Sequence, residues 1–309
     1  MEIAIETSEL TKTFGLVKRL TAVNALSMKI EKGTVHGFIG PNGAGKTTTI
    51  KMLTGSITPT KGSAQIFGIS AGKNEAKAKI GYSPEHPNFY SQSAFKFLVY
   101  NARICGIEKK EAELRATRLL DWMGLLDFRD RNAMGFSAGM KQKLGLLQAL
   151  IHDPEVLILD EPTANLDPIG RFDVLQKIRD LAKKEGKTIL VSSHILDELE
   201  KVVDHVTIIN KGHTVLQSDI SSLRNQFSSN KYVVETTNNQ TYLPQISKLG
   251  PAALNPDGNI EVTVKDPEKF KSSLFSLFKG NTKNLSGFYP LKMSLENIFM
   301  NVLGDKNDK

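Results

Sequence analysis

The 309-residue sequence predicts an α/β fold: a largely parallel sheet with helices, extended by an antiparallel β subdomain, a helical insertion and a small C-terminal α+β module. Three observations predict it. Largely apolar runs at 35–39, 156–159 and 188–191 are typical of parallel strands buried on both faces. Apolar residues recur at helical spacing through 93–152. Short alternating runs at 231–236 and 259–264 read as strands of a second, smaller module.

The chain therefore divides, by prediction, into a larger α/β domain at 1–217 and a smaller accessory module at 231–309. The helical subdomain spans about 93–152. A polar, serine-rich stretch at 218–230 is the predicted linker. The opening strands are expected at 3–10, 23–30 and 35–39, and an amphipathic helix at 267–278.

Composition limits the function classes. A formal charge of +7 would suit an anionic lipid surface or nucleic acid, but the basic residues are spread along the chain without a dense run. A single cysteine, Cys105, excludes an intramolecular disulfide and fits a reducing compartment. We see no signal peptide and no run of roughly twenty apolar residues that would span a membrane.

The stretch that organises the chain follows the strand at 35–39 and leads into a predicted helix at 48–53. Its spelling is that of a phosphate-binding loop: Gly40, Pro41, Asn42, Gly43, Ala44, Gly45, Lys46, Thr47 and Thr48. The glycines let the backbone curl so that successive N–H groups face a phosphate, and the helix N-terminus adds its dipole. Lys46 is expected to reach the β- and γ-phosphates, and the Thr47 hydroxyl to bind Mg²⁺.

Two carboxylates, Asp160 and Glu161, end the apolar strand at 156–159. Ligands of parallel α/β sheets bind at the carboxyl ends of the strands, so both carboxylates are expected beside the phosphates. Asp160 is the candidate for holding Mg²⁺, and Glu161 the candidate for polarising the attacking water. In the alternative interpretation, the strand ends in acidic residues simply because a loop begins there. The upstream phosphate loop favours the catalytic interpretation.

Three further features are weaker indications of a nucleotide contact when each is taken alone. Phe14, expected in the loop between the first two strands, could stack on an adenine ring or be a half-buried loop aromatic. Ser137, in the turn 135–142, would cap a helix whose N-terminus is also a ready phosphate site. His194 ends the strand at 188–191 on the edge where the phosphates should lie, although a lone histidine is usually structural.

In this order, the clusters at 40–48, Glu85, 136–142, 157–162, 164–167 and His194 resemble the ATP-binding cassette (ABC) family over about residues 3–217. The resemblance implies a P-loop NTPase core of the ABC ATPase type that hydrolyses ATP. It also implies adenine stacking by Phe14, a loop at Asp167 that communicates across a dimer, and a γ-phosphate contact by His194. The family's signature motif, which closes over the nucleotide of the other subunit, matches Ser137, Ala138, Gly139 and Met140.

Two departures from the family pattern matter. The signature, usually Leu-Ser-Gly-Gly-Gln, reads Phe-Ser-Ala-Gly-Met at 136–140, which keeps the serine and second glycine. The glutamine that normally follows the strand at 79–83 is Glu85, which could still bind Mg²⁺ or water but adds negative charge near the triphosphate. Together with the ending at 294–299, these features look like the branch that serves separate ABC-2 type export permeases.

The resemblance implies a set of partners: ATP, an integral-membrane permease, and a second ATPase subunit in a homodimer or a dimer with a related chain. We expect no specific nucleic acid, and a peripheral position on the cytoplasmic face of the membrane. Three alternatives stay open. They are an importer subunit, a soluble ABC ATPase acting on ribosomes or nucleic acid, and a binding module without turnover, which Glu161 and His194 argue against.

Overall fold

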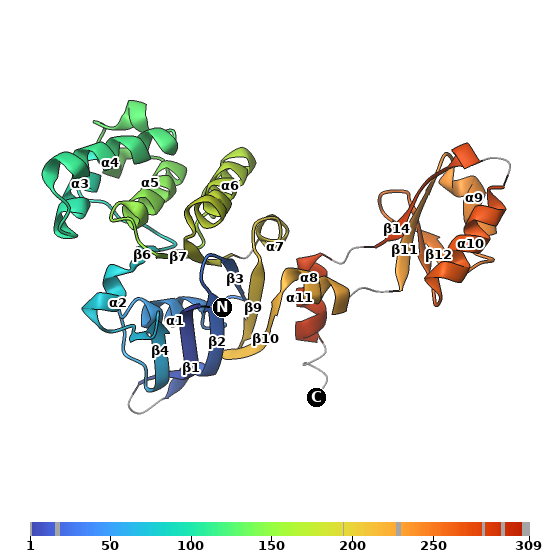
Figure 1. Cartoon of the computed structure of the whole chain (residues 1–309), viewed down its shortest axis with the longest axis horizontal. Coiled ribbons are helices and arrows are strands. Elements are labelled where there is room, and N and C mark those ends of the chain that lie inside the picture. Colours follow the sequence, from blue (N-terminus) through green and yellow to red (C-terminus); the bar gives the residue numbers. More distant parts are fainter. Residues whose placement is uncertain are drawn as a thin grey trace. The chain divides into compact units, whose positions relative to one another are not determined.

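The computed structural model describes residues 2–15, 19–193, 195–226, 230–279, 282–291 and 294–304 (Figure 1). The chain divides into two compact units. The first runs from Met1 to Ile220 and includes the chain from Val302 on, and the second is Ser221–Asn301.

The first unit contains two sheets. One is a four-stranded antiparallel sheet in the order β2-β1-β4-β5, and the other is a six-stranded sheet in the order β10-β9-β3-β8-β7-β6. The strands are β1 (Ile3–Phe14), β2 (Leu20–Glu31), β3 (Val35–Ile39), β4 (Lys61–Ile66), β5 (Ile69–Ser70), β6 (Ile80–Ser83), β7 (Val156–Asp160), β8 (Thr188–Ser192), β9 (His205–Asn210) and β10 (His213–Asp219). The helices are α1 (Lys46–Leu53), α2 (Asn74–Ala78), α3 (Ala94–Ile104), α4 (Lys109–Trp122), α5 (Ala138–Leu150), α6 (Pro168–Glu185) and α7 (Leu196–Leu199). Helix α8 (Ile220–Gln226) starts at the boundary, with all but its first residue in the second unit.

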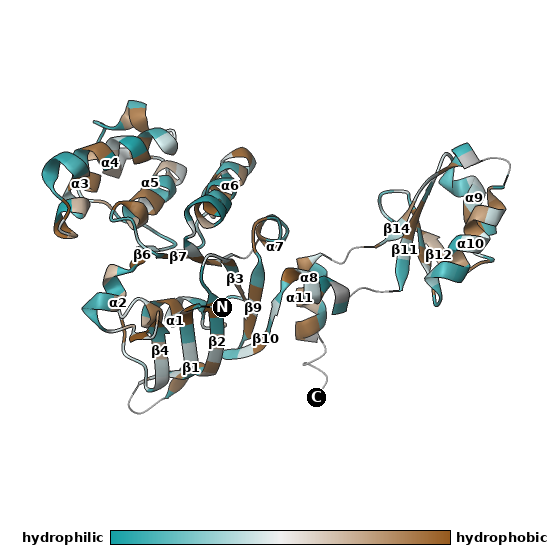
Figure 2. Ribbon diagram, in the orientation of Figure 1, coloured by the Kyte–Doolittle hydropathy of each residue, from teal (hydrophilic) through white to brown (hydrophobic). Residues whose placement is uncertain are grey.

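The six-stranded sheet positions the site. Strands β9, β3, β8, β7 and β6 are parallel neighbours, and β10 pairs antiparallel with β9. All residues of β3, β7 and β8 are buried, as their apolar runs predict, and β7 is hydrophobic along nearly its whole length (Figure 2). The loops after β3, β6, β7 and β8 therefore leave the sheet at one edge.

A hydrophobic core joins the two sheets of this unit. It contains side chains of β1 and β2, helix α1 and the central strands, including Ile5, Met28, Ile50, Ile158 and Leu190. Because α1 is packed into this core, its N-terminus is fixed relative to β7 and β8.

The segment from 93 to 152 is helical, with α3, α4 and α5 joined by the short 3₁₀ turns η1 (Leu126–Phe128) and η2 (Ala133–Gly135). Figure 1 shows α3, α4 and α5 (green) grouped together beyond β6 and β7. Helix α6 begins behind the Asp167 cap with Pro168 in its first turn and ends at Gly186, which has a left-handed backbone.

One expectation is corrected, and one stretch is more regular than its composition indicates. Phe14 is the last residue of β1 and not a loop residue, because the β1–β2 pairing continues to Phe14 opposite Leu20. The stretch 218–230, predicted as a polar linker, includes the end of β10 and the helix α8. This serine-rich stretch can form an amphipathic helix, because Ile220 and Leu223, three residues apart, are both buried and lie on the same face.

The second unit has the chain order β-α-β-β-α-β, with an antiparallel sheet in the order β12-β13-β11-β14. Its elements are β11 (Lys231–Thr236), α9 (Asn239–Ile246), β12 (Ala252–Leu254), β13 (Ile260–Thr263), α10 (Pro267–Leu277), η3 (Thr282–Asn284) and β14 (Leu285–Pro290). Helix α11 (Leu295–Gly304) crosses the boundary, since its residues from Val302 on belong to the first unit. A separate core joins its helices to one face of the sheet, with Val234, Ile260 and Val262 against Ile246 and Leu274.

Within the described ranges, none of the helices combines the length and apolarity that a membrane span requires.

Candidate functional site

The loop between β3 and α1 has the backbone geometry that its glycines predict. Gly43 and Gly45 have φ values of +78° and +104°, in the region that side chains disfavour. A Cβ at Gly40 would lie 2.5 Å from the Ile209 carbonyl oxygen, and one at Gly45 would lie 2.5 Å from the Ala22 carbonyl oxygen. Only glycine fits either position, because backbone atoms cannot move aside cheaply.

Lys46, the first residue of α1, lies over this loop. Its side chain is nearly buried, and Nζ donates to the carbonyl oxygens of Gly40 at 2.5 Å and Pro41 at 3.4 Å. The ammonium group is therefore held at the curl of the loop, where a phosphate that accepts from the loop N–H groups would meet it.

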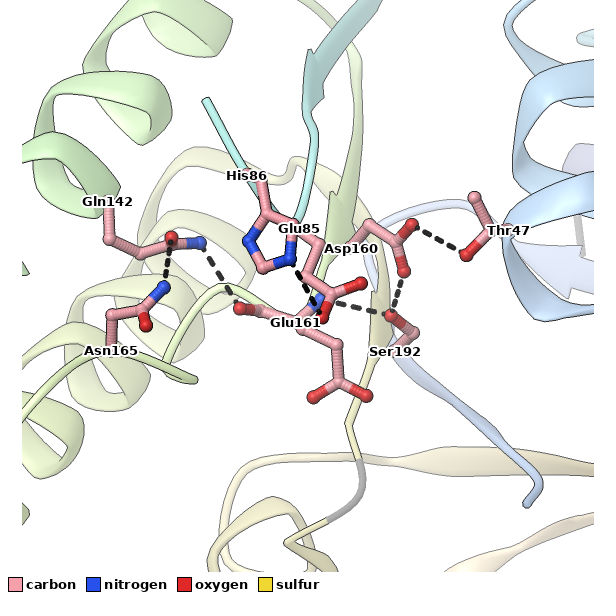
Figure 3. Close-up of polar contacts among 8 residues, drawn as sticks. All are labelled: Thr47, Glu85, His86, Gln142, Asp160, Glu161, Asn165 and Ser192. Carbon is pink, nitrogen blue, oxygen red and sulfur yellow. Dashed lines mark hydrogen bonds and ion pairs between the residues drawn. The ribbon is translucent and has the colours of Figure 1, made fainter. Parts of the chain in front are cut away.

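Asp160 lies across from Thr47 and contacts two hydroxyls. Thr47 Oγ1 donates to Asp160 Oδ2 at 3.1 Å, and Ser192 Oγ donates to Oδ1 at 2.6 Å (Figure 3). Asp160 and Ser192 are register partners at the ends of β7 and β8. Both oxygens of this buried carboxylate are therefore oriented by side chains from neighbouring elements.

Glu161 follows directly and turns the chain away from the strand. Its φ is +49°, unusual for a residue with a side chain. The backbone N–H donates to Ser192 Oγ at 3.0 Å, and the carbonyl accepts from Gln142 Nε2 at 3.1 Å. In Figure 3 the Glu161 carboxylate extends in a different direction from that of Asp160.

These groups border one cavity of about 570 Å³. Its lining consists of Leu20, Thr21, Ala22, Pro41, Asn42, Gly43, Gly45, Lys46, Thr47, Thr48, Glu85, Asp160 and Glu161. Two predicted loop residues, Gly40 and Ala44, support the loop without lining the cavity. The structure thus brings the phosphate loop, both strand-end carboxylates and Glu85 together.

Glu85 lies in the loop after β6, half exposed, with Oε1 3.6 Å from His86 Nε2 (Figure 3). Its charge also acts on Tyr82. Burial, then the carboxylates of Asp160 and Glu85, raise the pKa of Tyr82 to about 12. The phenol therefore stays neutral throughout the physiological range.

Five predicted residues lie elsewhere. Ser137, Ala138, Gly139 and Met140 form the start of α5, where Ser137 caps the helix by accepting from the Met140 N–H at 3.2 Å. Asp167 caps α6 by accepting from the Gly170 N–H at 3.0 Å. None of these five residues lines the cavity of this copy, and both caps are exposed.

Phe14 does not line the cavity either. Its ring is 42% exposed, with Lys12 Nζ 5.2 Å from its centroid. Its strand partner Leu20, which is 68% exposed, does line the cavity. His194, predicted to contact the γ-phosphate, lies outside the described residues.

The sequence interpretation missed two buried polar residues of the site. Ser192 ends β8 at the edge where ligands of such sheets bind, so its position alone could have indicated it. Gln142 gives no such indication, because it lies in the second turn of an apolar helix and meets Glu161 only through the tertiary fold.

Thr47 and Asp160 fit a magnesium ion by their chemistry, since Mg²⁺ prefers hydroxyl and carboxylate oxygens and these two lie 3.1 Å apart. Among the described residues there is no cluster of three or more His, Cys, Asp or Glu that could hold a metal by itself. A site with one or two protein ligands is what Mg²⁺ uses when substrate phosphates supply the rest.

Comparisons with known proteins identify the family to which the chain belongs. Residues 23–164 match the family model described as ABC transporter. The bacitracin transport ATP-binding protein BcrA of Bacillus licheniformis is 38% identical over 311 residues, which cover 98% of both chains. The linearmycin resistance ATP-binding protein LnrL of Bacillus subtilis (strain 168) is 30% identical over 97% of this chain and 98% of that protein.

Solved structures agree as well. The ATP binding subunit of an ABC transporter superposes with a TM-score of 0.66 at 29% identity, covering 72% of this chain and 93% of that one. The dimeric cassette MJ0796, bound to ADP and phosphate after hydrolysis, has the same TM-score at 21% identity, over 70% of this chain and 98% of that one, and so supports the fold. The chain therefore belongs to the ABC transporter family, as an ATP-binding subunit that hydrolyses ATP to power transport.

Proposed function

We propose that two copies of this chain, or one copy and a related ATPase subunit, close over two molecules of ATP and that hydrolysis reopens them. One observation carries the proposal: the helix start at Ser137 and Ala138 is exposed and lies outside the cavity of its own copy. A capped helix N-terminus with small residues suits a phosphate, so a second copy is the natural source of the nucleotide it would meet.

Within one copy, the proposed roles follow from the contacts. Lys46 would bind the β- and γ-phosphates from the curl of the loop, and Leu20, with its strand partner Phe14, lies where an adenine could stack. Thr47 and Asp160, with Glu85 nearby, would hold Mg²⁺, which supplies positive charge that offsets the phosphate charge. His194 would contact the γ-phosphate, as the resemblance implies.

Glu161 is the proposed general base. Its carboxylate would accept a proton from the water that attacks the γ-phosphorus, while the bond to the leaving ADP oxygen breaks. The products are ADP and inorganic phosphate. Asp167, at the cap of α6, would contact the other copy, as its exposure and its place directly after the catalytic loop allow.

The proposed transport direction is export through a separate integral-membrane permease, with this subunit peripheral on the cytoplasmic face. Two relatives that match nearly the whole chain are named for bacitracin transport and linearmycin resistance, and this similarity supports export of an antibiotic-like substrate. Import and a role on ribosomes or nucleic acid have no comparable support. Cells lacking the gene should retain more labelled bacitracin, used as a probe, than parent cells. Reduced uptake in the mutant would instead indicate import.

Complementation tests the composite site directly. Lys46→Ala and Ser137→Arg should each abolish hydrolysis, since every site of either homodimer lacks one half. A mixture of the two variants forms heterodimers in which one site is intact. We expect hydrolysis to reappear in the mixture at up to roughly a quarter of the parental rate, because about half of randomly paired dimers hold one working site of two. A mixture as inactive as its components would contradict the proposal.

A further inference from the structure

The backbone of Glu161 needs support from its surroundings. With φ at +49°, it occupies a region that residues with side chains rarely adopt, and such strain persists only where neighbouring groups maintain it. The strained position directly follows the strand end at Asp160. The direction in which the Glu161 side chain leaves the backbone therefore depends on whatever holds the backbone.

Ser192 provides one support. Its hydroxyl is completely buried and is used in both directions: the oxygen accepts from the Glu161 N–H at 3.0 Å, and its hydrogen is donated to Asp160 Oδ1 at 2.6 Å. A single atom from β8 thus ties the two consecutive acids together. Asp160 Oδ2 is left directed toward Thr47 at 3.1 Å.

Gln142 provides another support, from a different layer of the fold. It is 1% exposed, and its amide donates to the Glu161 carbonyl oxygen at 3.1 Å (Figure 3). Its own oxygen lies 3.5 Å from Asn165 Nδ2. The same carbonyl oxygen also accepts from the Ala164 N–H at 3.2 Å, within its own loop, so the Gln142 amide is a second donor that ties the backbone at Glu161 to α5.

The position of Gln142 along the chain matters. It lies five residues after Ser137, a little more than one helical turn from the start of α5. The first turn of α5 also packs closely on the loop after Glu161, because a Cβ at Gly139 would lie 3.1 Å from the Asn165 carbonyl oxygen. The N-terminal part of α5 therefore contains both the exposed helix start and Gln142, which contacts the backbone of Glu161.

We propose that Ser192 and Gln142 are positioning residues that hold the Glu161 backbone in its left-handed conformation, and that Gln142 makes the aim of Glu161 depend on the position of α5. The second part rests on the proposed function, in which the start of α5 binds the nucleotide of the other copy. A shift of α5 upon that binding then reaches the Glu161 of its own copy, so each site influences hydrolysis in the other.

The test compares two variants with matched controls. Ser192→Ala and Gln142→Met remove the two supports. Thr188→Val removes a hydroxyl that accepts from the Gly33 N–H at the opposite end of the same strand, and Gln148→Met makes the same change farther along α5. We expect kcat to fall at least tenfold in the first pair and to change less than twofold in the controls, with KM for MgATP within about threefold of the parent for Gln142→Met.

A readout other than activity separates the two supports. Ser192→Ala should weaken binding of MgATP severalfold relative to binding of ATP in EDTA, because Asp160 loses its orienting hydroxyl, whereas Gln142→Met should leave this ratio unchanged. If Ser192→Ala does not fold, as its melting curve would reveal, Ser192→Cys keeps the volume with a weaker donor and takes its place. Losses of kcat no larger than those of the controls would overturn the positioning role.

The coupling has its own measurement. The Hill coefficient of hydrolysis against ATP concentration should exceed 1 in the parent, fall toward 1 in Gln142→Met and stay at the parental value in Gln148→Met. Equal coefficients in the parent and Gln142→Met would overturn the coupling. If Glu161→Gln fails to dimerise with ATP, that result contradicts the proposed dimer and not the positioning role. The kcat comparison still tests positioning within one copy.

Discussion

Gly45 illustrates how a single residue sets the geometry of the phosphate loop. Gly45→Ala places a methyl group 2.5 Å from the Ala22 carbonyl oxygen at a φ of +104°, whereas Gly43→Ala meets no atom within 4 Å at a φ of +78°. We expect Gly45→Ala to lower the free energy of unfolding by about 1–3 kcal/mol, more than Gly43→Ala does, and to weaken ATP binding as well. Urea unfolding and titration with a fluorescent ATP would measure both. Equal effects of the two substitutions would contradict the close contact.

His36 makes stability depend on pH. Its ring is buried in β3, with Nε2 2.7 Å from Thr207 Oγ1 and the ring stacked 6.2 Å from that of His205. Burial, then the charge of His205, lowers the pKa of His36 to about 3. The unfolded chain binds a proton below about pH 6.5 and the folded chain does not, so stability falls as the pH falls between these values.

Replacing this histidine should remove that dependence. Between pH 6 and pH 4, the parent should lose about 1.4 kcal/mol per pH unit more than His36→Gln, as measured by urea unfolding. The pKa of His152 is also lowered by burial, but His152 is present in both chains, so its contribution cancels. Parallel stability curves for the two proteins would show that His36 is protonated in the folded state.

Among single residues, the sequence predicts the position of those that belong to a recognisable local pattern. The loop lysine and threonine, the two strand-end acids and Glu85 all border the same cavity. Ser192 and Gln142 escape prediction because they act through contacts with Glu161 that join positions 31 and 19 residues away. The expectation of a loop at Phe14 is wrong because nothing local shows how far a strand pairing extends.

Among the elements, α5 and β6 pack against each other at a glycine of the strand. A Cβ at Gly81 in β6 would lie 2.0 Å from the Ala149 carbonyl oxygen of α5, so the helix rests directly on the strand. We expect Gly81→Ala to lower the free energy of unfolding by about 1–3 kcal/mol or more, because the helix must move away. Gly72→Ala is the matched control, since no atom lies within 4 Å of its Cβ. Thermal unfolding of the two variants makes the comparison, and equal melting temperatures would contradict the close packing of helix on strand.

Elements are predictable where their periodicity is strong. The helices within 93–152 and the buried strands β3, β7 and β8 follow the apolar pattern. Helix α8 does not, because it has only two buried apolar residues among polar ones. The strands β12 and β14 and the helix α9 also escape prediction, since short half-buried elements of a small module carry little pattern of their own.

In the molecule as a whole, each unit has its own core, and the nucleotide cavity lies entirely in the first. Leu274→Ala, at a fully buried position of the second core, should destabilise that unit by about 2–5 kcal/mol. MgATP at a hundred times its Kd should stabilise only the first unit, by about 2.7 kcal/mol. Calorimetry should thus show two transitions that respond separately. A single transition shifted by both changes would mean that the units unfold together.

Closure of two copies over ATP, with Glu161 as the base, is the core of the proposed mechanism, and sedimentation of Glu161→Gln tests it. The substitution keeps the shape of the side chain and removes the charge that accepts the proton, so ATP should bind without being hydrolysed. We predict that MgATP converts this variant from monomer to dimer, while ADP does not, and that the parent hydrolyses ATP at a measurable rate. A variant that stays monomeric with ATP bound, or one that hydrolyses ATP as fast as the parent, would contradict this mechanism.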